Sequence, residues 1–202
     1  MLASSADVYD TSDHDHFEGE PLCPRNPYGL SKVLAEEIVA YGCRKNPHLN
    51  ASILRFFNVY GPRDTTPHII PRAIELVTNP LLNEVRMGYL GGSRDFVHVS
   101  DAVEAILMCI EQASSGCEVF NVGTGVATSI CRVVQIIQEL TGDHKPVAEV
   151  QSQFRCFDRK SLTADIRKIT SQLGWYPRIK LSQGLERLLV EMNLILPAKG
   201  VA

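Results

Sequence analysis

The stretch Asn-Pro-Tyr-Gly-Leu-Ser-Lys at residues 26–32 opens a long run of regularly spaced apolar residues. Asn26 suits the position before a helix, and Pro27 suits the first helical position, where a backbone N–H would have no intrahelical partner. Tyr28 and Lys32 are four residues apart, which places them on one face of a helix. The sequence therefore predicts a helix over residues 27–44 with a tyrosine in its first turn.

The first turn of a helix favours a negatively charged oxygen, because its backbone N–H groups are unpaired and the positive end of the helix dipole lies there. A tyrosine normally loses its proton near pH ~10, so a tyrosine that acts as a base near neutrality needs nearby positive charge. Lys32, one turn along the helix, can supply that charge together with a cationic cofactor ring. Tyr28 is therefore a candidate general base.

The spacing Tyr-x-x-x-Lys alone is a weak indication of a catalytic pair, since it recurs at residues 41–45 and 176–180. We interpret those two as solvated pairs. Tyr28 differs in its context. The segment Ala-Ser-Ser-Ala-Asp-Val-Tyr at residues 3–9 has the pattern of a strand end and a turn. We expect it to bring the Ser5 hydroxyl into the same crevice as Tyr28.

Composition narrows the class of protein. The chain has 202 residues, of which 45% are hydrophobic, so it can bury a substantial core. Its formal charge is −3 with no basic block, which makes a nucleic-acid partner unexpected. No apolar run approaches the ~18 residues that cross a bilayer, so we expect no membrane association and a cytoplasmic location. The six cysteines form no Cys-x-x-Cys pair, and we interpret them as reduced.

Further elements follow from hydrophobic periodicity. Leu30, Leu34, Ile38 and Tyr41 recur at helical spacing, so we expect them to face the core. The apolar run at 51–57 predicts a buried parallel strand. Additional predictions are a helix reaching residue 77, a strand at 85–89, a helix at 102–112 capped by Ser100 or Asp101, a strand at 118–122, a helix capped by Ser129, and a last helix at 181–194.

Two blocks follow predicted strands. The first is Arg-Phe-Phe-Asn-Val-Tyr-Gly-Pro at residues 55–62, and the second is Arg-Asp-Phe-Val-His-Val-Ser-Asp at residues 94–101. Open α/β sheets bind ligands at the carboxyl ends of their strands, so the first block is where substrate contacts are expected. The Arg94 guanidinium offers a planar fork of donors that matches a phosphate group. We interpret His98 as a residue that makes a buried hydrogen bond.

Together with residues 3–9 and 26–32, these blocks resemble the NAD-dependent nucleotide-sugar epimerase/dehydratase family of extended short-chain dehydrogenases/reductases, and most closely its UDP-glucose 4-epimerases. The resemblance covers nearly the whole chain. It implies an α/β fold: the C-terminal portion of a Rossmann-type doubly wound parallel sheet plus a small α/β substrate-binding domain. Residues 1–65, with parts of 88–125, would belong to the NAD-binding domain, and residues 66–202 mainly to the substrate domain. The glycine-rich turn that holds the dinucleotide in the family is not found, so we expect a fragment or a truncated form.

The resemblance also implies roles for individual residues. Ser5, Tyr28 and Lys32 would be catalytic, and Tyr28, Lys32 and the backbone near Phe57 would contact NAD. The expected contacts to the nucleotide-sugar, a UDP- or dTDP-sugar, come from Asn58, Arg94, Arg155 and Asp158. A homodimer through the Tyr28 helix is a further expectation. Residues 154–158, Phe-Arg-Cys-Phe-Asp, match a short pattern that chance also produces.

A polar, acidic segment at residues 10–25 is predicted to form a surface loop. Within it, Asp13, His14, Asp15 and His16 can be drawn as a metal cluster. However, alternating ligands on a loop lack the fixed spacing of a metal site. We therefore expect a hydrated loop near the cofactor and no metal.

The reaction implied by the resemblance is a 4-epimerisation of the sugar through a 4-keto intermediate. Two alternatives remain open. A dehydratase or decarboxylase on the same scaffold needs extra acid or base groups after the serine. Ala6 cannot transfer a proton, which favours the epimerase, whereas Asp7 keeps the alternative open. The other alternative is a non-catalytic remnant that binds a nucleotide-sugar or a partner, because the cofactor half is missing.

Overall fold

The computed structural model describes residues 1–64, 66–112, 116–153 and 160–197. Within them the strands are β1 (Leu2–Ser5), β2 (Ala51–Phe56), β3 (Asn58–Tyr60), β4 (Val85–Met87), β5 (Ser93–His98), β6 (Cys117–Val122), β7 (Ala127–Ser129) and β8 (Val147–Glu149). The α-helices are α1 (Pro27–Lys45), α2 (Ile69–Thr78), α3 (Val99–Glu111), α4 (Ile130–Thr141), α5 (Arg167–Leu173) and α6 (Leu181–Glu191). Short 3₁₀ turns cover Ala6–Val8 and Gln151–Gln153.

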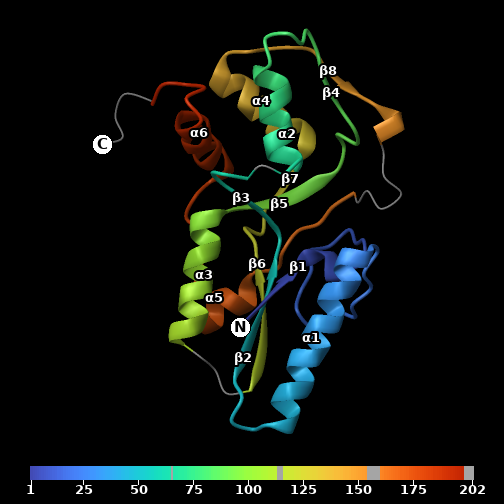
Figure 1. Cartoon of the computed structure of the whole chain (residues 1–202), viewed down its shortest axis with the longest axis vertical. Helices are drawn as coiled ribbons and strands as arrows, with labels where there is room; N and C mark the ends of the chain where they lie inside the picture. Colours follow the sequence, from blue (N-terminus) through green and yellow to red (C-terminus); the bar gives the residue numbers. More distant parts are fainter. Residues whose placement is uncertain (65, 113–115, 154–159, 198–202) are drawn as a thin grey trace.

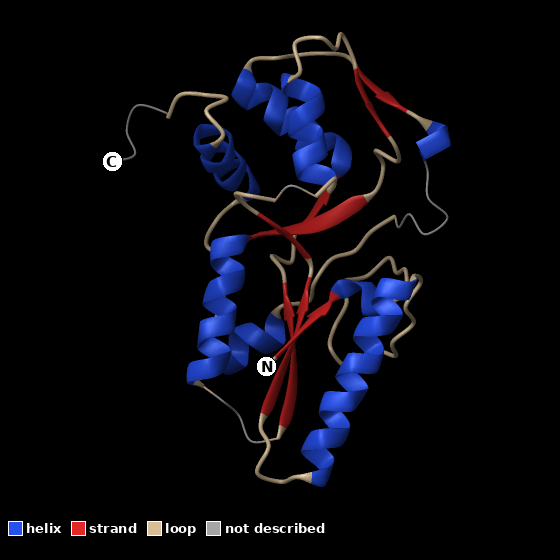
Figure 2. Cartoon of the chain, in the orientation of Figure 1, coloured by secondary structure: helices blue, strands red, loops and turns tan. Residues whose placement is uncertain are grey.

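The first sheet has the strand order β1-β2-β6, and both pairings are parallel. Helix α1 lies on one side of this sheet, and α3 and α5 lie on the other (Figures 1 and 2). The central strand β2 buries Ile53 and Leu54. A buried parallel strand normally reads as a continuous apolar run, so the expectation of a strand at 51–57 is confirmed. The α/β class with parallel sheets is also confirmed.

A second group of elements lies beyond the ends of the first sheet (Figure 1). Strand β3 follows β2 after Phe57 and pairs in parallel with β5, which pairs antiparallel with β7. Strands β4 and β8 form a separate parallel pair. Helices α2, α4 and α6 pack together there around Ile74, Ile137 and Leu189. The division at residue 65 stays a prediction; α5, from the C-terminal part of the chain, packs on β6 of the first sheet.

Helix α1 begins as its sequence predicts. The Asn26 Oδ1 atom accepts a hydrogen bond from the Gly29 N–H at 2.7 Å, and Pro27 occupies the first turn. The expected orientation of the helix, however, is wrong. Leu30, Leu34, Ile38 and Tyr41 are 50%, 56%, 72% and 57% exposed and do not face the core.

The face of α1 that meets the sheet buries Gly29 and Glu36 instead. Glu36 receives a bidentate bond from Arg55 on β2, with its Oε2 atom 2.7 Å from Nη2 and its Oε1 atom 3.0 Å from Nε. The Ser4 hydroxyl on β1 also donates to Glu36. Arg55 and Glu36 are both buried, so a polar anchor, and not an apolar stripe, joins this helix to two strands.

The Arg55 guanidinium extends this anchor to the loop after β1. It donates to the Tyr9 hydroxyl at 2.9 Å and to the Glu18 carbonyl at 3.1 Å. The Tyr9 hydroxyl in turn donates to the Asn121 Oδ1 atom on β6 at 2.7 Å. The buried polar side chains of Arg55, Tyr9 and Asn121 thus satisfy one another, as buried polar groups generally do.

The caps of two later helices test the sequence predictions. Ser129 caps α4 as expected, accepting from the Arg132 N–H at 3.1 Å. Helix α3 starts earlier than expected, and its cap is His98, whose Nδ1 atom accepts from the Ser100 N–H at 3.2 Å. The expectation of Ser100 or Asp101 as the cap is therefore wrong, because both residues already lie inside the helix. His98 is buried with a hydrogen bond, as predicted.

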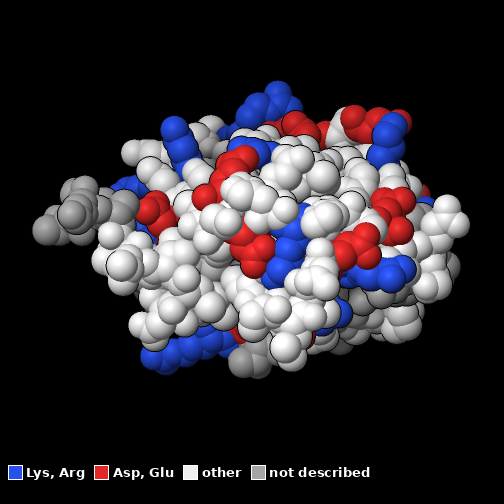
Figure 3. All heavy atoms as spheres, turned by 90° about the horizontal axis from the view of Figure 1, so that it is seen from above, with Lys and Arg blue, Asp and Glu red and all other residues white. Residues whose placement is uncertain are grey.

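The surface bears on what the chain can bind. Lys and Arg side chains are interspersed with Asp and Glu side chains on the face seen in Figure 3, so that face has no field of a single sign. Among the described residues, no helix combines the length and apolarity that a bilayer crossing requires. Five of the cysteines are free, and Cys156 lies outside the described residues.

Replacing Glu36 with Ala should lower the free energy of unfolding by about 3–5 kcal/mol, because the Arg55 charge would remain buried without its partner. The matched control is Glu139→Ala on α4, which removes an exposed ion pair with Arg132 at 2.8 Å. Exposed pairs contribute less than about 1 kcal/mol. Denaturant unfolding of both variants measures the difference. Equal, small effects would show that the anchor contributes no more than a surface pair.

Candidate active site

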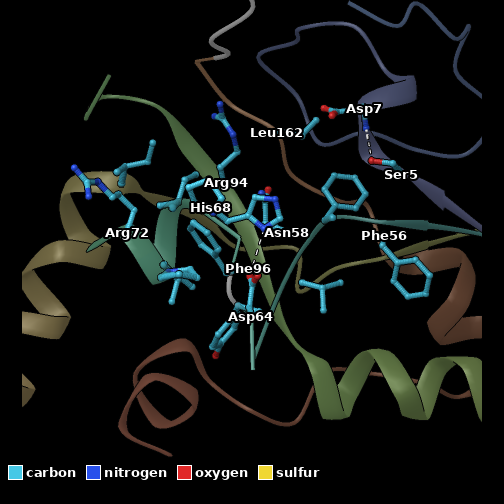
Figure 4. Close-up of a pocket in the computed structure, with 18 of the residues that line it drawn as sticks. Ser5, Asp7, Phe56, Asn58, Asp64, His68, Arg72, Arg94, Phe96 and Leu162 are labelled. Carbon is cyan, nitrogen blue, oxygen red and sulfur yellow. Dashed lines mark hydrogen bonds and ion pairs between the residues drawn. The ribbon is translucent and has the colours of Figure 1, made fainter. Parts of the chain in front are cut away.

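A cavity of about 1100 Å³ lies where β1, β2 and β3 end against α1, β5 and α2. It is lined by Ser5, Tyr28, Lys32, Phe57, Asn58 and Arg94, among other residues. Figure 4 shows Ser5 and Asp7 on one side and Arg94, His68 and Arg72 on the other. The structure thus brings together every predicted site residue that lies within the described part of the chain. Arg155 and Asp158 lie outside the described residues.

Tyr28 and Lys32 lie side by side in the first turns of α1. The Lys32 Nζ atom is 5.4 Å from the centre of the Tyr28 ring. The same atom donates to the Ala3 carbonyl on β1 at 2.9 Å, so the ammonium group is held between the helix and the strand. The Tyr28 side chain is 53% exposed and opens to the cavity. This arrangement places a positive charge beside a phenol that a ligand can reach.

Ser5 reaches the cavity from the end of β1. Its Oγ atom accepts a hydrogen bond from the Asp7 N–H at 3.1 Å, so its own proton can be donated to a ligand oxygen. Asp7 lines the same cavity, and its Oδ2 atom accepts from the Asn26 Nδ2 atom at 3.4 Å. Asn26, the residue before α1, is thereby connected to Asp7, two residues after Ser5.

Gly29 brings the Ser5 strand and the Tyr28 helix into close contact. A Cβ atom added to Gly29 would stand 2.2 Å from the Asp7 carbonyl oxygen. No side chain can occupy that space, so only glycine allows the first turn of α1 to lie against the turn after Ser5. The relative position of the two hydroxyl groups depends on this contact.

Asn58 contributes an unsatisfied acceptor. Its Oδ1 atom is the one buried side-chain polar atom without a hydrogen-bond partner among the described residues. A buried amide oxygen without a partner costs about 1–3 kcal/mol, so its presence beside a cavity is typical of a ligand site. Phe57, just before it, is buried between the Ala6–Val8 turn and Leu162.

Arg94 projects from β5 into the cavity (Figure 4). Its Nη1 atom donates to the carbonyl of Ser93 at 2.8 Å, which orients the guanidinium group. The neighbouring Asp95 has a different function, because it is buried and accepts from the N–H groups of Thr124, Gly125 and Ala164. Burial raises the pKa of the Asp95 carboxyl group. Asp95 therefore organises the loop after β6 and does not face the cavity.

Other tyrosines are poor candidates for a base. Burial raises the pKa of Tyr9 to about 12, and its hydroxyl is engaged with Arg55 and Asn121. Tyr60 lines the cavity, but burial and the nearby Asp101 charge raise its pKa as well. A raised pKa disfavours the phenolate form that a base requires.

Comparison with known proteins identifies the class of this site. The sequence model of a family described as GDP-mannose 4,6 dehydratase matches residues 1–188. The chain belongs to this family of NAD-dependent nucleotide-sugar epimerases and dehydratases. The solved structure of MoeE5 in complex with UDP-glucuronic acid and NAD is 35% identical with a TM-score of 0.86, over 95% of this chain and 63% of that one.

Curated members of the family with different reactions match equally well. UDP-glucose 4-epimerase of Dictyostelium discoideum is 29% identical over 87% of this chain, and dTDP-glucose 4,6-dehydratase of Streptomyces griseus is 30% identical over 92%. The chain spans 56% of the length of each of these relatives. The reaction must therefore be inferred from the site itself.

The structure adds cavity residues that the sequence did not single out. His68 and Arg72 reach the cavity from the start of α2, and the His68 Nδ1 atom lies 3.3 Å from the Asp64 Oδ2 atom (Figure 4). Arg86 on β4 also lines it. The sequence predicted only that a helix in this region reaches residue 77, and gave no sign that its start would line the cavity. The cluster of arginines arises only from the folding of distant segments.

Replacing Gly29 with Ala should destabilise the protein by about 1–3 kcal/mol, as overpacking generally does, and should separate Ser5 from Tyr28. Gly42, in the same helix, is the matched control, because an added Cβ would meet Leu49 at an ordinary 3.4 Å. Gly42→Ala should be neutral or stabilising by up to about 1 kcal/mol from helix propensity. Thermal unfolding of both variants tests this. A Gly29→Ala protein as stable as Gly42→Ala would contradict the close contact.

Proposed function

We propose that this chain forms the substrate side of a nucleotide-sugar 4-epimerase that uses NAD. The observation that carries the proposal is the convergence of Ser5, Tyr28 and Lys32 on one cavity, next to the unsatisfied Oδ1 atom of Asn58. Those groups supply a base, its activating cation, a hydroxyl donor and an acceptor for a ligand. The proposal is supported by the family to which the chain belongs, which comprises NAD-dependent nucleotide-sugar epimerases and dehydratases.

Tyr28 is the base in this proposal. Its phenolate removes the proton of the sugar hydroxyl at C4, and the Ser5 hydroxyl donates a hydrogen bond to the same oxygen. The Lys32 ammonium group lies beside the Tyr28 ring, where its positive charge favours an anionic oxygen, and it would contact the nicotinamide ribose. The same groups return the proton when the keto-sugar is reduced on its opposite face.

The residues present fit the cofactor that the family implies. An ammonium group has three N–H donors, and the bond to Ala3 uses one of those on Lys32. Lys32, Tyr28 and the backbone beside Phe57 are the residues of this chain that would hold the nicotinamide end of NAD. When bound, NAD would supply the hydride acceptor and donor that make the oxidation to a 4-keto-sugar reversible. The described residues offer no glycine-rich turn for the pyrophosphate.

Arg94 is proposed to bind the diphosphate of a UDP- or dTDP-sugar, with Asn58 on the sugar-nucleotide. Arg72 and Arg86 line the same cavity, which gives it the positive charge that an anionic substrate needs. Arg155 and Asp158, which lie outside the described residues, are also proposed to contact the substrate. The chain would then comprise the C-terminal portion of a Rossmann-type sheet, residues 1–65, and a substrate domain.

Asp7 supports a second candidate, a dehydratase or decarboxylase. Its carboxylate lines the cavity two residues after Ser5, where it can exchange a proton with a second carbon of the sugar. We favour the epimerase because Ala6 offers no second acid or base group. Binding of the nucleotide-sugar by the whole protein without turnover would instead support the non-catalytic alternative.

Replacing Tyr28 with Phe in the whole protein should abolish epimerisation and leave the affinity for the nucleotide-sugar within a few-fold. Tyr41→Phe is the matched control, because Tyr41 lies on the same helix with Lys45 Nζ at 5.6 Å from its ring. That variant should retain full turnover. Coupled assay of UDP-sugar interconversion measures both. Turnover by Tyr28→Phe would remove Tyr28 from the mechanism.

Replacing Lys32 with Ala should shift the pH optimum of turnover upward, because the phenolate loses the charge that favours it. Lys45→Ala is the control. It alters the similar pair of Tyr41 and Lys45 at the C-terminal end of α1 and should keep the original optimum. The pH dependence of kcat/KM for the two variants tests the expectation. An unchanged optimum in Lys32→Ala would leave Lys32 with a binding role alone.

Replacing Arg94 with Ala should weaken UDP binding at least about tenfold, since one charge-assisted hydrogen bond contributes ~1.5–3 kcal/mol and a decade corresponds to ~1.4. Arg178→Ala, at an exposed ion pair with Glu104, is the control and should bind as the parent protein does. Calorimetric titration with UDP measures both affinities. Equal affinities would return Arg94 to a structural role.

A homodimer through α1 is proposed from the exposed apolar stripe of Leu30, Leu34, Ile38 and Tyr41. Ile38→Arg should shift sedimentation of the protein from dimer to monomer. Leu81→Arg is the control, because Leu81 is 87% exposed but lies apart from the stripe in the turn after α2. A dimer that survives Ile38→Arg would place the interface elsewhere.

A further inference from the structure

Three side chains that can bind a metal meet in the loop between β1 and α1, outside the cavity. The His16 Nδ1 atom is 2.8 Å from the Glu20 Oε2 atom, and the His14 Nε2 atom is 3.1 Å from Glu20 Oε1. The ligand atoms of the three residues lie within 4.8 Å of one another. Asp13 and Asp15, the other members of the cluster considered from the sequence, are not part of this group.

His16 is held rigidly, unlike a residue of a hydrated loop. It is 1% exposed, so the expectation of a hydrated loop is wrong at this position. Its N–H donates to the Thr163 carbonyl at 2.9 Å, and its carbonyl accepts from the Asp165 N–H at 2.8 Å. Its ring stacks on Tyr9 with the ring centres 4.6 Å apart. The fixed position that a metal ligand needs, which the sequence spacing did not indicate, is supplied by these contacts with distant residues.

The hydrogen bonds of Ser12 determine which nitrogen of His16 carries a proton. The Ser12 hydroxyl donates its single proton to the His14 carbonyl at 2.7 Å. Its oxygen, 3.2 Å from His16 Nε2, must therefore accept a proton from that nitrogen. In the neutral ring, Nδ1 then directs a lone pair at a carboxylate oxygen 2.8 Å away. Two lone pairs repel at that distance, so a positive charge, either a proton or a metal ion, must lie between these two atoms, and a third ligand group, His14, stands beside them.

We propose that the positive charge is a Zn²⁺ ion bound by His14, His16 and Glu20. Zinc bonds to nitrogen and oxygen are ~2.0–2.2 Å, which puts tetrahedral ligands roughly 3.3 Å apart. The observed separations of 2.8 and 3.1 Å, each to a different oxygen of Glu20, are within a few tenths of an ångström of that value. All the ligand atoms lie within 4.8 Å of one another, so small side-chain rotations bring the three groups to one ion. The His14 side chain is 63% exposed, so a water molecule can reach the fourth position.

The surroundings of the ligands are those of a metal site. The Ser12 oxygen fixes the His16 tautomer with Nδ1 toward the ion, and the Phe17 N–H orients the Glu20 carboxylate at 2.9 Å. Such partners of the ligands commonly orient them in metal sites. The ion closes the loop that joins the Ser5 strand to the Tyr28 helix, so its role is to stabilise that loop.

The test is calorimetric titration of Zn²⁺ into the chelator-treated whole protein. His14→Ala, at an exposed side chain, and Glu20→Gln, which keeps the shape of the side chain, should each weaken binding at least tenfold, since even the partners of ligands contribute 10–100-fold. Two controls should bind as the parent protein does. His144→Ala removes another exposed histidine, and Cys117→Ser removes a thiol that interacts with Cys43, which distinguishes zinc binding by these thiols.

Binding of one Zn²⁺ that is lost in His14→Ala and Glu20→Gln, with a matching loss of the zinc-dependent rise in Tm, establishes the site. Three results would overturn it. Zinc binding that persists in both ligand variants, or that disappears with Cys117→Ser, places the ion elsewhere. Absence of zinc binding means that a proton bridges His16 and Glu20 as an ion pair.

Discussion

The buried ion pair between Glu36 and Arg55 is the interaction on which the rest of the structure depends. Glu36 lies two turns after Tyr28 on α1, and Arg55 lies near the C-terminal end of β2. Their bidentate contact, shared with Ser4 on β1, fixes both the height and the rotation of the helix against the sheet. Desolvating two charges is unfavourable, so the pair is more important for specifying this position than for total stability.

The site follows from that position. With Glu36 facing the sheet, Lys32 one turn earlier meets the Ala3 carbonyl, and Gly29 contacts the Asp7 backbone. Tyr28 then projects past the sheet edge into the cavity, where Ser5 also ends. The proposed catalytic groups are thus placed by regular structure, and the close contact at Gly29 leaves little freedom between them. This is the preorganisation that proton transfer in a short hydrogen bond requires.

Local signals predicted much of this arrangement. Asn26 and Pro27 specified the start of α1, and the continuous apolar run of β2 specified a buried parallel strand. The orientation of α1 was not predictable in the same way. Hydrophobic periodicity assigns the apolar face to the core, but here the buried face carries glycine and glutamate, and Leu34 and Ile38 are exposed. A polar anchor satisfied by a distant arginine leaves no periodic signal in the sequence.

His16 failed prediction for a related reason. Its burial depends on Thr163 and Asp165, about 150 residues away, which no spacing in the loop can reveal. The arginines of the cavity likewise come from separate elements, β5, α2 and β4. Sequence motifs predicted the relative placement of residues within neighbouring turns of one helix, as with Tyr28 and Lys32, but not the placement of residues that the fold brings together from distant segments.

The central claim is that Tyr28 and its partners move a proton and a hydride at one carbon of the sugar. Turnover of a UDP-sugar carrying deuterium at C4 by the whole protein, followed by NMR, tests it most directly. The epimerase account predicts that deuterium returns to C4 of the inverted product. Deuterium found on the carbon that loses a leaving group would contradict it and assign the site to a dehydratase.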